Sequence, residues 1–420
     1  MDPQPPLAPT VAERAPLPLA GVTVVALEQA VAAPLATRHL ADLGARVVKV
    51  ERREGGDFAR GYDSTIKGQS SHFVWLNRGK QSVALDVKTP GGRDVLARLI
   101  ATADVFVQNL APGATERLGF GAATLRARHP RLVTVDMSGY GSGGPYETRR
   151  AYDMLVQCEA ALISVTGSPD RPAKAGFPAS DIAAGMYALS SVLAALFRRT
   201  TTGLGAEIEI SMLEATSEWM GFHLYFAQGT GRTPQRMGLS HASVAPYDAF
   251  PTADGADVMI GVQNDREWVR FACDVLDRPH LATDPEWATN EARVHGRGAL
   301  NALIAGVTSR LAGAALEQSL QRAGIAYARL GDANDLLDHP QLAARQRWRP
   351  VGTPAGVVRG LLPPFTFADV ELPMGPVPAL GEHTEAVLRD LGYADERIAV
   401  LGDLDAIGLP PARAEAAPVA

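Results

Sequence analysis

Few of the residues that build redox or metal sites occur in this sequence. Its 420 residues include two cysteines, Cys158 and Cys273, which lie far apart and outside any CxxC pattern. The nine histidines are scattered, with neither HxH nor HxxxH spacing. We therefore expect two buried free thiols in a reducing cytoplasm, no disulfide framework and no metal site.

Long apolar runs are also missing. No stretch of about 18 consecutive apolar residues occurs, which argues against a membrane span. Residues 1–18 are rich in Pro and Ala and lack the basic start and apolar centre of a signal peptide, so we interpret them as a disordered extension. The expected location is cytoplasmic.

An excess of positive charge is absent as well. The net charge of −6 argues against a nucleic-acid-binding surface. Residues 38–88 differ, because they hold ten Lys or Arg residues against six Asp or Glu. Such a region suits a small polyanion such as a phosphorylated cofactor, although a solvated face of mixed charge is the commoner explanation.

Alternating segments predict an α/β fold. Apolar runs at 22–27, 45–50, 83–85, 105–107 and 132–135 alternate with helical patterns at 33–43, 91–102 and 114–128. This alternation predicts a doubly wound parallel sheet that binds ligands at the carboxyl ends of its strands. Further along, we expect a strand at 203–210, a hairpin at 247–262 and helices at 181–199, 211–228, 265–276, 298–310, 314–323 and 382–392.

The usual phosphate-binding and nucleophile motifs do not accompany this pattern. The turn after the first predicted strand, residues 27–34, has no G-x-G-x-x-G, and the chain contains neither a P-loop nor a G-x-S-x-G elbow. A redox enzyme of the Rossmann type is therefore disfavoured.

One aspartate opens the long Ala-rich helix predicted at 181–199. Ser180 or Asp181 is expected to cap this helix, where free N–H groups and the helix dipole would favour an ionised carboxylate. Ala179, Ala183 and Gly185 are small enough to let a substrate carbonyl approach. Asp181 is thus a candidate nucleophile, and an ordinary helix cap is the alternative.

Several short motifs, in order, resemble those of the class III CoA-transferase family, also called the CaiB/BaiF or formyl-CoA transferase family. The resemblance runs from about Leu19 to the helix after Gly381. Its motifs are Ala33-Pro34, 43–52 (LGARVVKVER), 56–61 (GDFARG), 77–82 (NRGKQS), 85–90 (LDVKTP), 109–113 (NLAPG), 139–141 (GYG), the Asp181 segment, 202–205 (TGLG) and 380–384 (LGEHT).

The resemblance implies an α/β fold with a large Rossmann-like domain, a smaller α+β domain, and ring-shaped subunits interlocked in a homodimer. The expected division is a large CoA-binding domain at 19–200, a linker helix region at 201–229, a small domain at 230–330 and a return segment at 331–420 that completes the large domain.

The resemblance also implies the chemistry and the site. The family's nucleophilic aspartate falls on Asp181, which would form aspartyl anhydride and aspartyl-CoA thioester intermediates. Coenzyme A is then a substrate, and no tightly bound cofactor is expected. The positions carried over as CoA contacts are Val31, Ala32, Arg52, Leu85, Lys88, Asn109, Arg117 and Arg150.

The sequence around residues 27–34 and 71–77 is similar to that of family members that act on C4 to C5 dicarboxylates such as itaconate, mesaconate, citramalate or malate, with succinyl-CoA as donor. Arg60, Arg78 or Arg232 would then bind the second carboxylate. A Gly-rich loop of formyl-CoA transferases is replaced near 239–243, which disfavours formate and oxalate.

Two other functions remain open. α-Methylacyl-CoA racemases of the same fold place a His-Asp pair where this chain has Tyr152-Asp153, so a racemase would lack one of its two bases. A non-catalytic CoA-binding protein is the other alternative.

Overall fold

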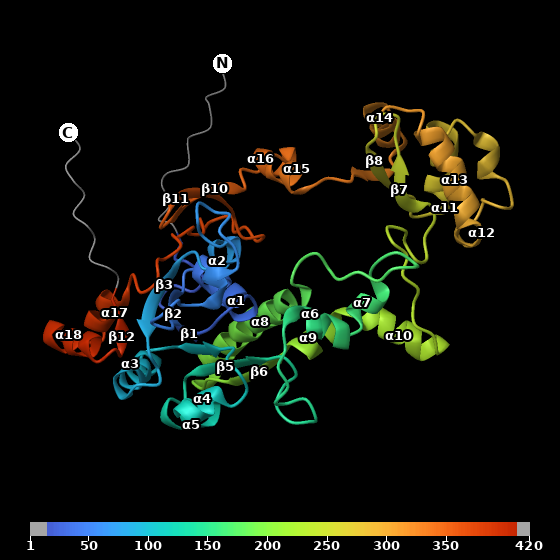
Figure 1. Ribbon diagram of the computed structural model, residues 1–420. Helices are drawn as coiled ribbons and strands as arrows, with labels where there is room; N and C mark the ends of the chain where they lie inside the picture. The colour runs from blue at the N-terminus through green and yellow to red at the C-terminus, as the bar shows by residue number, and fades with distance from the viewer. Residues whose placement is uncertain (1–14, 410–420) are drawn as a thin grey trace, which may run out of the picture. The chain divides into compact units, whose positions relative to one another are not determined.

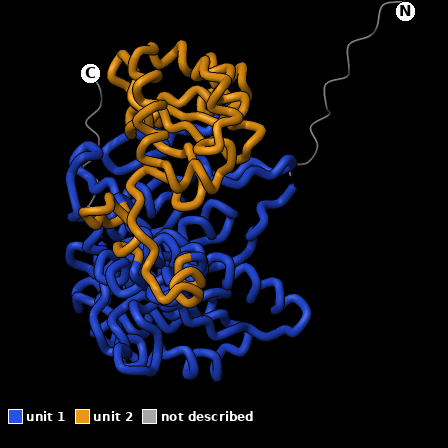
Figure 2. The backbone as a smooth tube through the Cα atoms, turned by 90° about the vertical axis from the view of Figure 1, so that its right-hand side faces the viewer, with its two compact units in different colours: residues 1–161, 176–222, 345–420 blue, residues 162–175, 223–344 orange. Residues whose placement is uncertain are grey.

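The computed structural model describes residues 15–409, which form two compact units (Figure 1). Unit 1 contains residues 15–161, 176–222 and 345–409, and unit 2 contains residues 162–175 and 223–344 (Figure 2). The predicted disordered extension at 1–18 lies largely outside the described residues. The chain leaves unit 1 at residue 222 and returns at 345, and the short segment 162–175 also belongs to unit 2.

Unit 1 is built on a seven-stranded sheet with the order β12-β3-β2-β1-β4-β5-β6. All neighbouring strands are parallel except β12, which pairs antiparallel with β3. Val24 of β1 pairs with Val47 of β2 on one side and with Val105 of β4 on the other. Because β1 is central and the strand order reverses there, the crevice beside its carboxyl end is the expected ligand site.

The strands of unit 1 are β1 (Thr23–Leu27), β2 (Arg46–Glu51), β3 (Lys80–Leu85), β4 (Val105–Gln108), β5 (Val133–Ser138), β6 (Glu207–Ser211), β12 (Ile407–Gly408) and the hairpin β10 (Trp348–Thr353) and β11 (Gly356–Leu361). Its helices are α1 (Ala32–Asp42), η1 (Phe58–Gly61), α2 (Ser71–Leu76), α3 (Pro90–Ala101), α4 (Ala114–Leu118), α5 (Ala122–Arg128), α6 (Asp153–Glu159), α8 (Ala179–Thr202), α9 (Met212–Trp219), α17 (Thr384–Asp390) and α18 (Asp395–Asp403).

Two apolar cores cover the two faces of this sheet. Val24 and Ala26 pack into one core, with α1 and α8, whereas Val25 and Leu27 pack into the other, with α3 and α17. Successive side chains of a strand point to opposite faces, so a strand buried on both faces reads as a continuous apolar run. This confirms the predicted parallel sheet.

Unit 2 is an α+β unit with an antiparallel sheet of order β7-β8-β9. Trp268, Phe271 and Leu316 are fully buried in its core. Its elements are α7 (Leu162–Val165), β7 (Tyr247–Pro251), β8 (Asp257–Gly261), α11 (Asp265–Arg270), the π-helical turn η2 (Phe271–Val275), η3 (Pro279–Ala282), α12 (Asn290–His295), α13 (Arg297–Thr308), α14 (Gly313–Ala323), β9 (Ala326–Arg329), α15 (Ala333–Leu337) and α16 (Pro340–Ala344); α10 (Gly221–Thr230) crosses from one unit to the other.

By length and composition alone, helix α8 could cross a membrane. Half of its apolar window is buried inside the protein, where it packs on α1. A mostly apolar helix buried in this way is typical of a protein core.

Both cysteines are free, as predicted, but the expectation that they are buried is wrong. Cys158 is exposed on α6 and Cys273 is half-buried in η2. Their apolar sequence surroundings do not face the interior at these two positions.

Candidate active site

Asp181 lies in the first turn of α8, as expected, but it does not cap the helix. The N-cap residue is Pro178, whose side chain makes no capping hydrogen bond. Instead, the Asp153 Oδ1 atom of α6 accepts hydrogen bonds from the backbone N–H groups of Ser180 (2.8 Å) and Asp181 (3.2 Å). Free N–H groups at a helix start need such acceptors, so Asp153 performs the capping role predicted for Ser180 or Asp181.

The environment of the Asp181 carboxyl also differs from the prediction of an ionised group. The pKa of Asp181 is raised to about 7, first by burial and then by the negative charge of Asp153. Among the described residues, no donor binds this carboxylate. An unpartnered carboxylate in a sheltered position is available to attack a substrate once it has lost its proton.

Two tyrosines share this neighbourhood. The pKa of Tyr62 is raised to about 12 by burial and then by Asp57, Asp181 and Tyr152. Tyr152, which stands where racemases have a histidine, is one of these tyrosines, and Tyr62 is a neighbour that the sequence does not single out. A phenol after a Gly-Asp-Phe segment carries no sequence signal of its own.

The turn after β1 is held from two sides. The Asn109 side chain at the end of β4 accepts from the Gln29 N–H (2.9 Å) and donates to the Gln29 carbonyl (2.8 Å). On the other side, Asp57 Oδ1 accepts from the Ala30 N–H at 3.0 Å, where Ala30 has a left-handed φ of 64°. Asn109, predicted to contact CoA, therefore uses its amide to shape the turn that precedes Val31.

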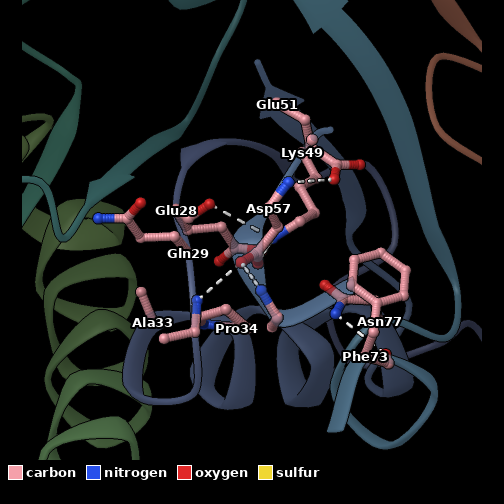
Figure 3. A network of polar contacts seen from close by, with 12 residues as sticks. Glu28, Gln29, Ala33, Pro34, Lys49, Glu51, Asp57, Phe73 and Asn77 are labelled. Carbon is pink, nitrogen blue, oxygen red and sulfur yellow. Dashed lines mark hydrogen bonds and ion pairs between the residues drawn. The ribbon is translucent and has the colours of Figure 1, made fainter. Parts of the chain in front are cut away.

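A buried network of charges stands behind this turn (Figure 3). Lys49 Nζ lies 2.9 Å from Asp57 Oδ2 and 3.4 Å from Glu28 Oε1, and Lys80 Nζ lies 2.7 Å from Glu28. Although burial opposes ionisation, the two lysines hold the pKa of Glu28 low, and the carboxylates hold the pKa of Lys49 high. Paired charges of this kind fix one geometry, since losing one partner leaves a buried charge uncompensated.

The remaining predicted CoA contacts follow the carboxyl ends of neighbouring strands in unit 1. Val31 and Ala32 follow β1, Arg52 follows β2, and Leu85 and Lys88 end or follow β3. Arg52 and Lys88 are exposed, whereas Val31, Ala32 and Leu85 are buried, and Leu85 belongs to the apolar core on the α3 face.

Two more arginines lie further along this edge. Arg117 is exposed on α4, where its Nη1 atom donates to the Pro112 carbonyl at 3.4 Å. Arg150 is exposed in the loop between β5 and α6. The sheet thus brings the ends of β3, β2, β1 and β4 together, with Arg150 in the loop that follows the next strand.

The three arginines considered for a second carboxylate are not equivalent. Arg60 is paired with Glu51 at 2.8 Å and stacks on Phe73 at 3.7 Å. Arg78 is paired with Asp42 through two hydrogen bonds of 2.8 and 2.7 Å. Arg232 is exposed in unit 2. The charges of Arg60 and Arg78 are therefore already compensated.

A family model for CoA-transferase family III matches residues 19–384. The chain belongs to this family. It is therefore a class III CoA-transferase, whose substrates are CoA thioesters. Within residues 15–409 of this transferase, no group of three or more His, Cys, Asp or Glu residues is placed to hold a metal ion.

Individual relatives agree with this assignment. An acetyl-CoA:oxalate CoA-transferase of Acetobacter aceti is 35% identical over 78% of this chain and 84% of its own. A succinate–glutarate CoA-transferase of Agrobacterium fabrum is 32% identical over 89% and 96%. The crystal structure of a CaiB/BaiF family protein from Brucella suis is 33% identical, with a TM-score of 0.80 over 89% of this chain and 99% of that one.

Proposed function

We propose that this transferase moves CoA from a donor acyl-CoA, succinyl-CoA being the donor we favour, to a small carboxylic acid through covalent intermediates on Asp181. The observation that carries this proposal is the unpartnered, sheltered Asp181 carboxyl at the start of α8, whose backbone is fixed by Asp153. As acceptor we favour a C4 to C5 dicarboxylate such as itaconate, mesaconate, citramalate or malate, in line with the succinate–glutarate relative.

The proposed reaction has four steps that balance without ATP or a metal. The Asp181 carboxylate attacks the thioester carbonyl, the C–S bond breaks, and an aspartyl anhydride and CoA thiolate form. The thiolate then attacks the aspartyl carbonyl and releases the donor acid. The acceptor carboxylate displaces the thiolate to give a second anhydride, and the thiolate attacks the acceptor acyl carbon, which regenerates Asp181.

The proton must leave Asp181 before the first step. Burial raises the energy of the ionised form and so makes the carboxylate a stronger nucleophile when it forms. The same shelter keeps water from the anhydride, whose hydrolysis would waste the donor.

The racemase alternative finds less support in these contacts. Asp153 uses Oδ1 for the start of α8 and Oδ2 to accept from Gln157 Nε2 at 2.6 Å. A carboxylate committed on both oxygens is poorly placed to move a proton, and residue 152 is a tyrosine.

We further propose that CoA lies along the carboxyl ends of β3, β2, β1 and β4. In this arrangement Arg52, Lys88, Arg117 and Arg150 bind phosphate groups, and the turn at Val31 and Ala32, fixed by Asn109, approaches the pantetheine or adenine. We propose a cytoplasmic homodimer as the working form.

The decisive experiment is covalent trapping. The protein is incubated with succinyl-CoA, treated with hydroxylamine, digested and analysed by mass spectrometry. We expect a hydroxamate on Asp181 alone, and loss of both the adduct and CoA transfer in Asp181→Ala. Asp274→Ala, which removes an exposed carboxylate of unit 2, is the matched control and retains both.

An adduct on another residue, or transfer that survives in Asp181→Ala, would contradict the mechanism. Incorporation of solvent deuterium at the α-carbon of a 2-methylacyl-CoA, without transfer, would instead identify a racemase. CoA binding without either activity would identify a binding protein.

A further inference from the structure

A cavity of about 490 Å³ lies in unit 1, and its wall includes the first turns of α8. Ile182, which directly follows Asp181, lines it together with Met186, one turn further along α8. Leu35 of α1, Val74 of α2 and Val351 of β10 contribute more of its wall. This part of the cavity wall, which includes the residue that follows Asp181 in the chain, is thus apolar and suits methylene groups.

The next turn of α1 brings positive charge to the same cavity. Arg38 lies three residues after Leu35, about 4.5 Å along the helix axis, and both residues line the cavity. Arg38 is only 6% exposed. Its Nη2 atom donates to His39 Nε2 at 2.7 Å, but its Nε atom is buried without a hydrogen-bond partner.

The charges around Arg38 do not balance. Arg78 takes both oxygens of Asp42, and Arg38 Nε remains 3.8 Å from that carboxylate. His39 offers no negative charge, and burial and the two guanidinium groups lower its pKa to about 3, so it adds no positive charge either. Two buried guanidinium groups therefore share one carboxylate.

A second unsatisfied donor belongs to the same cavity wall. Trp348 of β10 lines the cavity, and its Nε1 atom is buried without a partner. Buried donors are normally satisfied, so an exception calls for an explanation. Arg38 and Trp348 offer donors only, and a carboxylate offers acceptors only, which makes the two complementary.

We infer that this cavity binds the non-reacting carboxylate of a dicarboxylic acid, with Arg38 and Trp348 as its donors and the apolar wall around the intervening methylene groups. The inference deepens the proposed function and rests on it, since the reacting carboxylate must reach Asp181. Arg38 thus takes the place of Arg60 and Arg78 as the candidate residue that binds the second carboxylate. The charges of Arg60 and Arg78 are already compensated by Glu51 and Asp42.

The experiment compares two acceptors of equal length, glutarate and valerate, which differ only in the second carboxylate. kcat/KM for each is measured with succinyl-CoA as donor in the wild type, Arg38→Met, Arg38→Lys and Arg349→Met. Arg349 lies on the same hairpin but does not line the cavity, so it is the matched control. Circular dichroism and thermal unfolding establish that each variant is folded.

We expect the wild type and Arg349→Met to prefer glutarate. Arg38→Met should lower kcat/KM for glutarate by roughly 10- to 100-fold, mainly through KM, and leave valerate within about threefold. Arg38→Lys should retain part of the preference, because it keeps the charge without the planar fork. If Arg38→Met is unfolded, the test rests on Arg38→Lys, whose ratio of kcat/KM for glutarate to kcat/KM for valerate should be lower than that of the wild type.

Equal losses for both acceptors in folded Arg38→Met, or a wild type that transfers to both acids equally well, would overturn the inference while leaving the proposed transfer chemistry intact. Absence of transfer to any acid, together with no hydroxamate on Asp181, would overturn the proposed function and this inference with it.

Discussion

At the scale of single residues, the proposed nucleophile Asp181 should link activity to pH. The pKa of Asp181 is raised to about 7 by burial and then by Asp153. Only the ionised carboxylate attacks a thioester, so we expect kcat/KM to rise with pH from about 6 to 8 and then level off. Initial rates across this range check the expectation. A flat profile would mean that Asp181 is ionised throughout.

The same shift predicts how stability depends on pH. Because the folded pKa lies above the ordinary value of 3.8, the folded protein holds this proton more tightly. That stabilisation is complete below about pH 4 and is lost as the pH rises through 7. Asp181→Asn resembles the neutral form, so its advantage in free energy of unfolding should grow between pH 5 and pH 8, by on the order of 1–3 kcal/mol.

Thermal unfolding at both pH values measures this difference. Asp274→Asn, at an exposed position of unit 2, should show the same offset from the wild type at pH 5 and pH 8. An equal offset for Asp181→Asn would remove the basis for a raised pKa.

Asp153 has two separable effects on its neighbour, a hydrogen-bonding one and an electrostatic one. Asp153→Asn keeps an oxygen for the N–H groups of α8 but removes the charge, so the acid limb of the pH profile should move to lower pH. Asp153→Ala also removes the hydrogen bonds, which should lower stability by about 1–2 kcal/mol and kcat by roughly 10- to 100-fold. A purely structural Asp153 would leave the pH profile of Asp153→Asn unchanged.

The role of Asp153 marks the limit of prediction at this scale. The sequence places Asp181 at the start of a helix, because Ala-rich periodicity and a preceding proline are local signals. The acceptor for its N–H comes from a residue 28 positions away, and no local pattern records that approach. Leu85 gives a second example. Its place in a family motif suggests a ligand contact, but its position in β3 puts its side chain in the apolar core.

At the scale of elements, the contact between α1 and α8 sets the position of the site. A Cβ atom at Gly185 would lie 2.7 Å from the Ala32 carbonyl oxygen and 3.2 Å from Leu35 Cβ. Gly185→Ala must therefore push the helices apart, and we expect a loss of about 1–3 kcal/mol in stability and reduced kcat. Thermal unfolding and transfer assays measure the two effects.

Gly306 is the matched control for this substitution, because it lies inside α13 and a Cβ atom there would meet nothing within 4 Å. Gly306→Ala should raise stability by about 0.5–1 kcal/mol, as alanine favours a helix. If both substitutions stabilise the protein, α1 and α8 are not in close contact at Gly185.

The breaks within two predicted helices, and one hairpin, were not predictable from local sequence patterns. The predicted helix at 114–128 is divided into α4 and α5, because Gly119 adopts a left-handed φ of 84°. The predicted helix at 211–228 is likewise divided, with α9 ending before Met220. The β10–β11 hairpin was not predicted, since Pro350, Gly352 and Gly360 interrupt its alternation and its pairing depends on the partner strand.

At the scale of the whole molecule, unit 1 needs distant parts of the chain. The antiparallel pairing of β12 with β3 joins Ile407 to Leu85 across the sequence, and α17 and α18 complete the core on that face. β12 has two residues and no pattern of its own, so only the family resemblance predicted this return. Strand β12 is held in place by its pairing with β3 and by packing in the apolar core.

The exposed apolar surface of helix α10 leads us to predict that copies of the chain associate through this helix. It has no buried residue, and Leu224, Tyr225 and Phe226 are 54%, 77% and 41% exposed. Consecutive residues point in different directions around a helix, so this helix is apolar on most sides, as expected of one that is covered in an assembly. We expect a homodimer in sedimentation velocity, and a species of about half its mass for the double variant Leu224→Glu/Tyr225→Glu.

Leu404→Glu is the control, because Leu404 is an exposed leucine that follows α18, an element of unit 1 far from α10 in the sequence. It should leave the dimer intact. A wild-type chain that sediments as a monomer, or a double variant that remains dimeric, would exclude α10 as the interface. Loss of transfer activity in the same double variant would indicate that the dimer is the working enzyme, since neither position lines the cavity that contains Arg38 and Ile182.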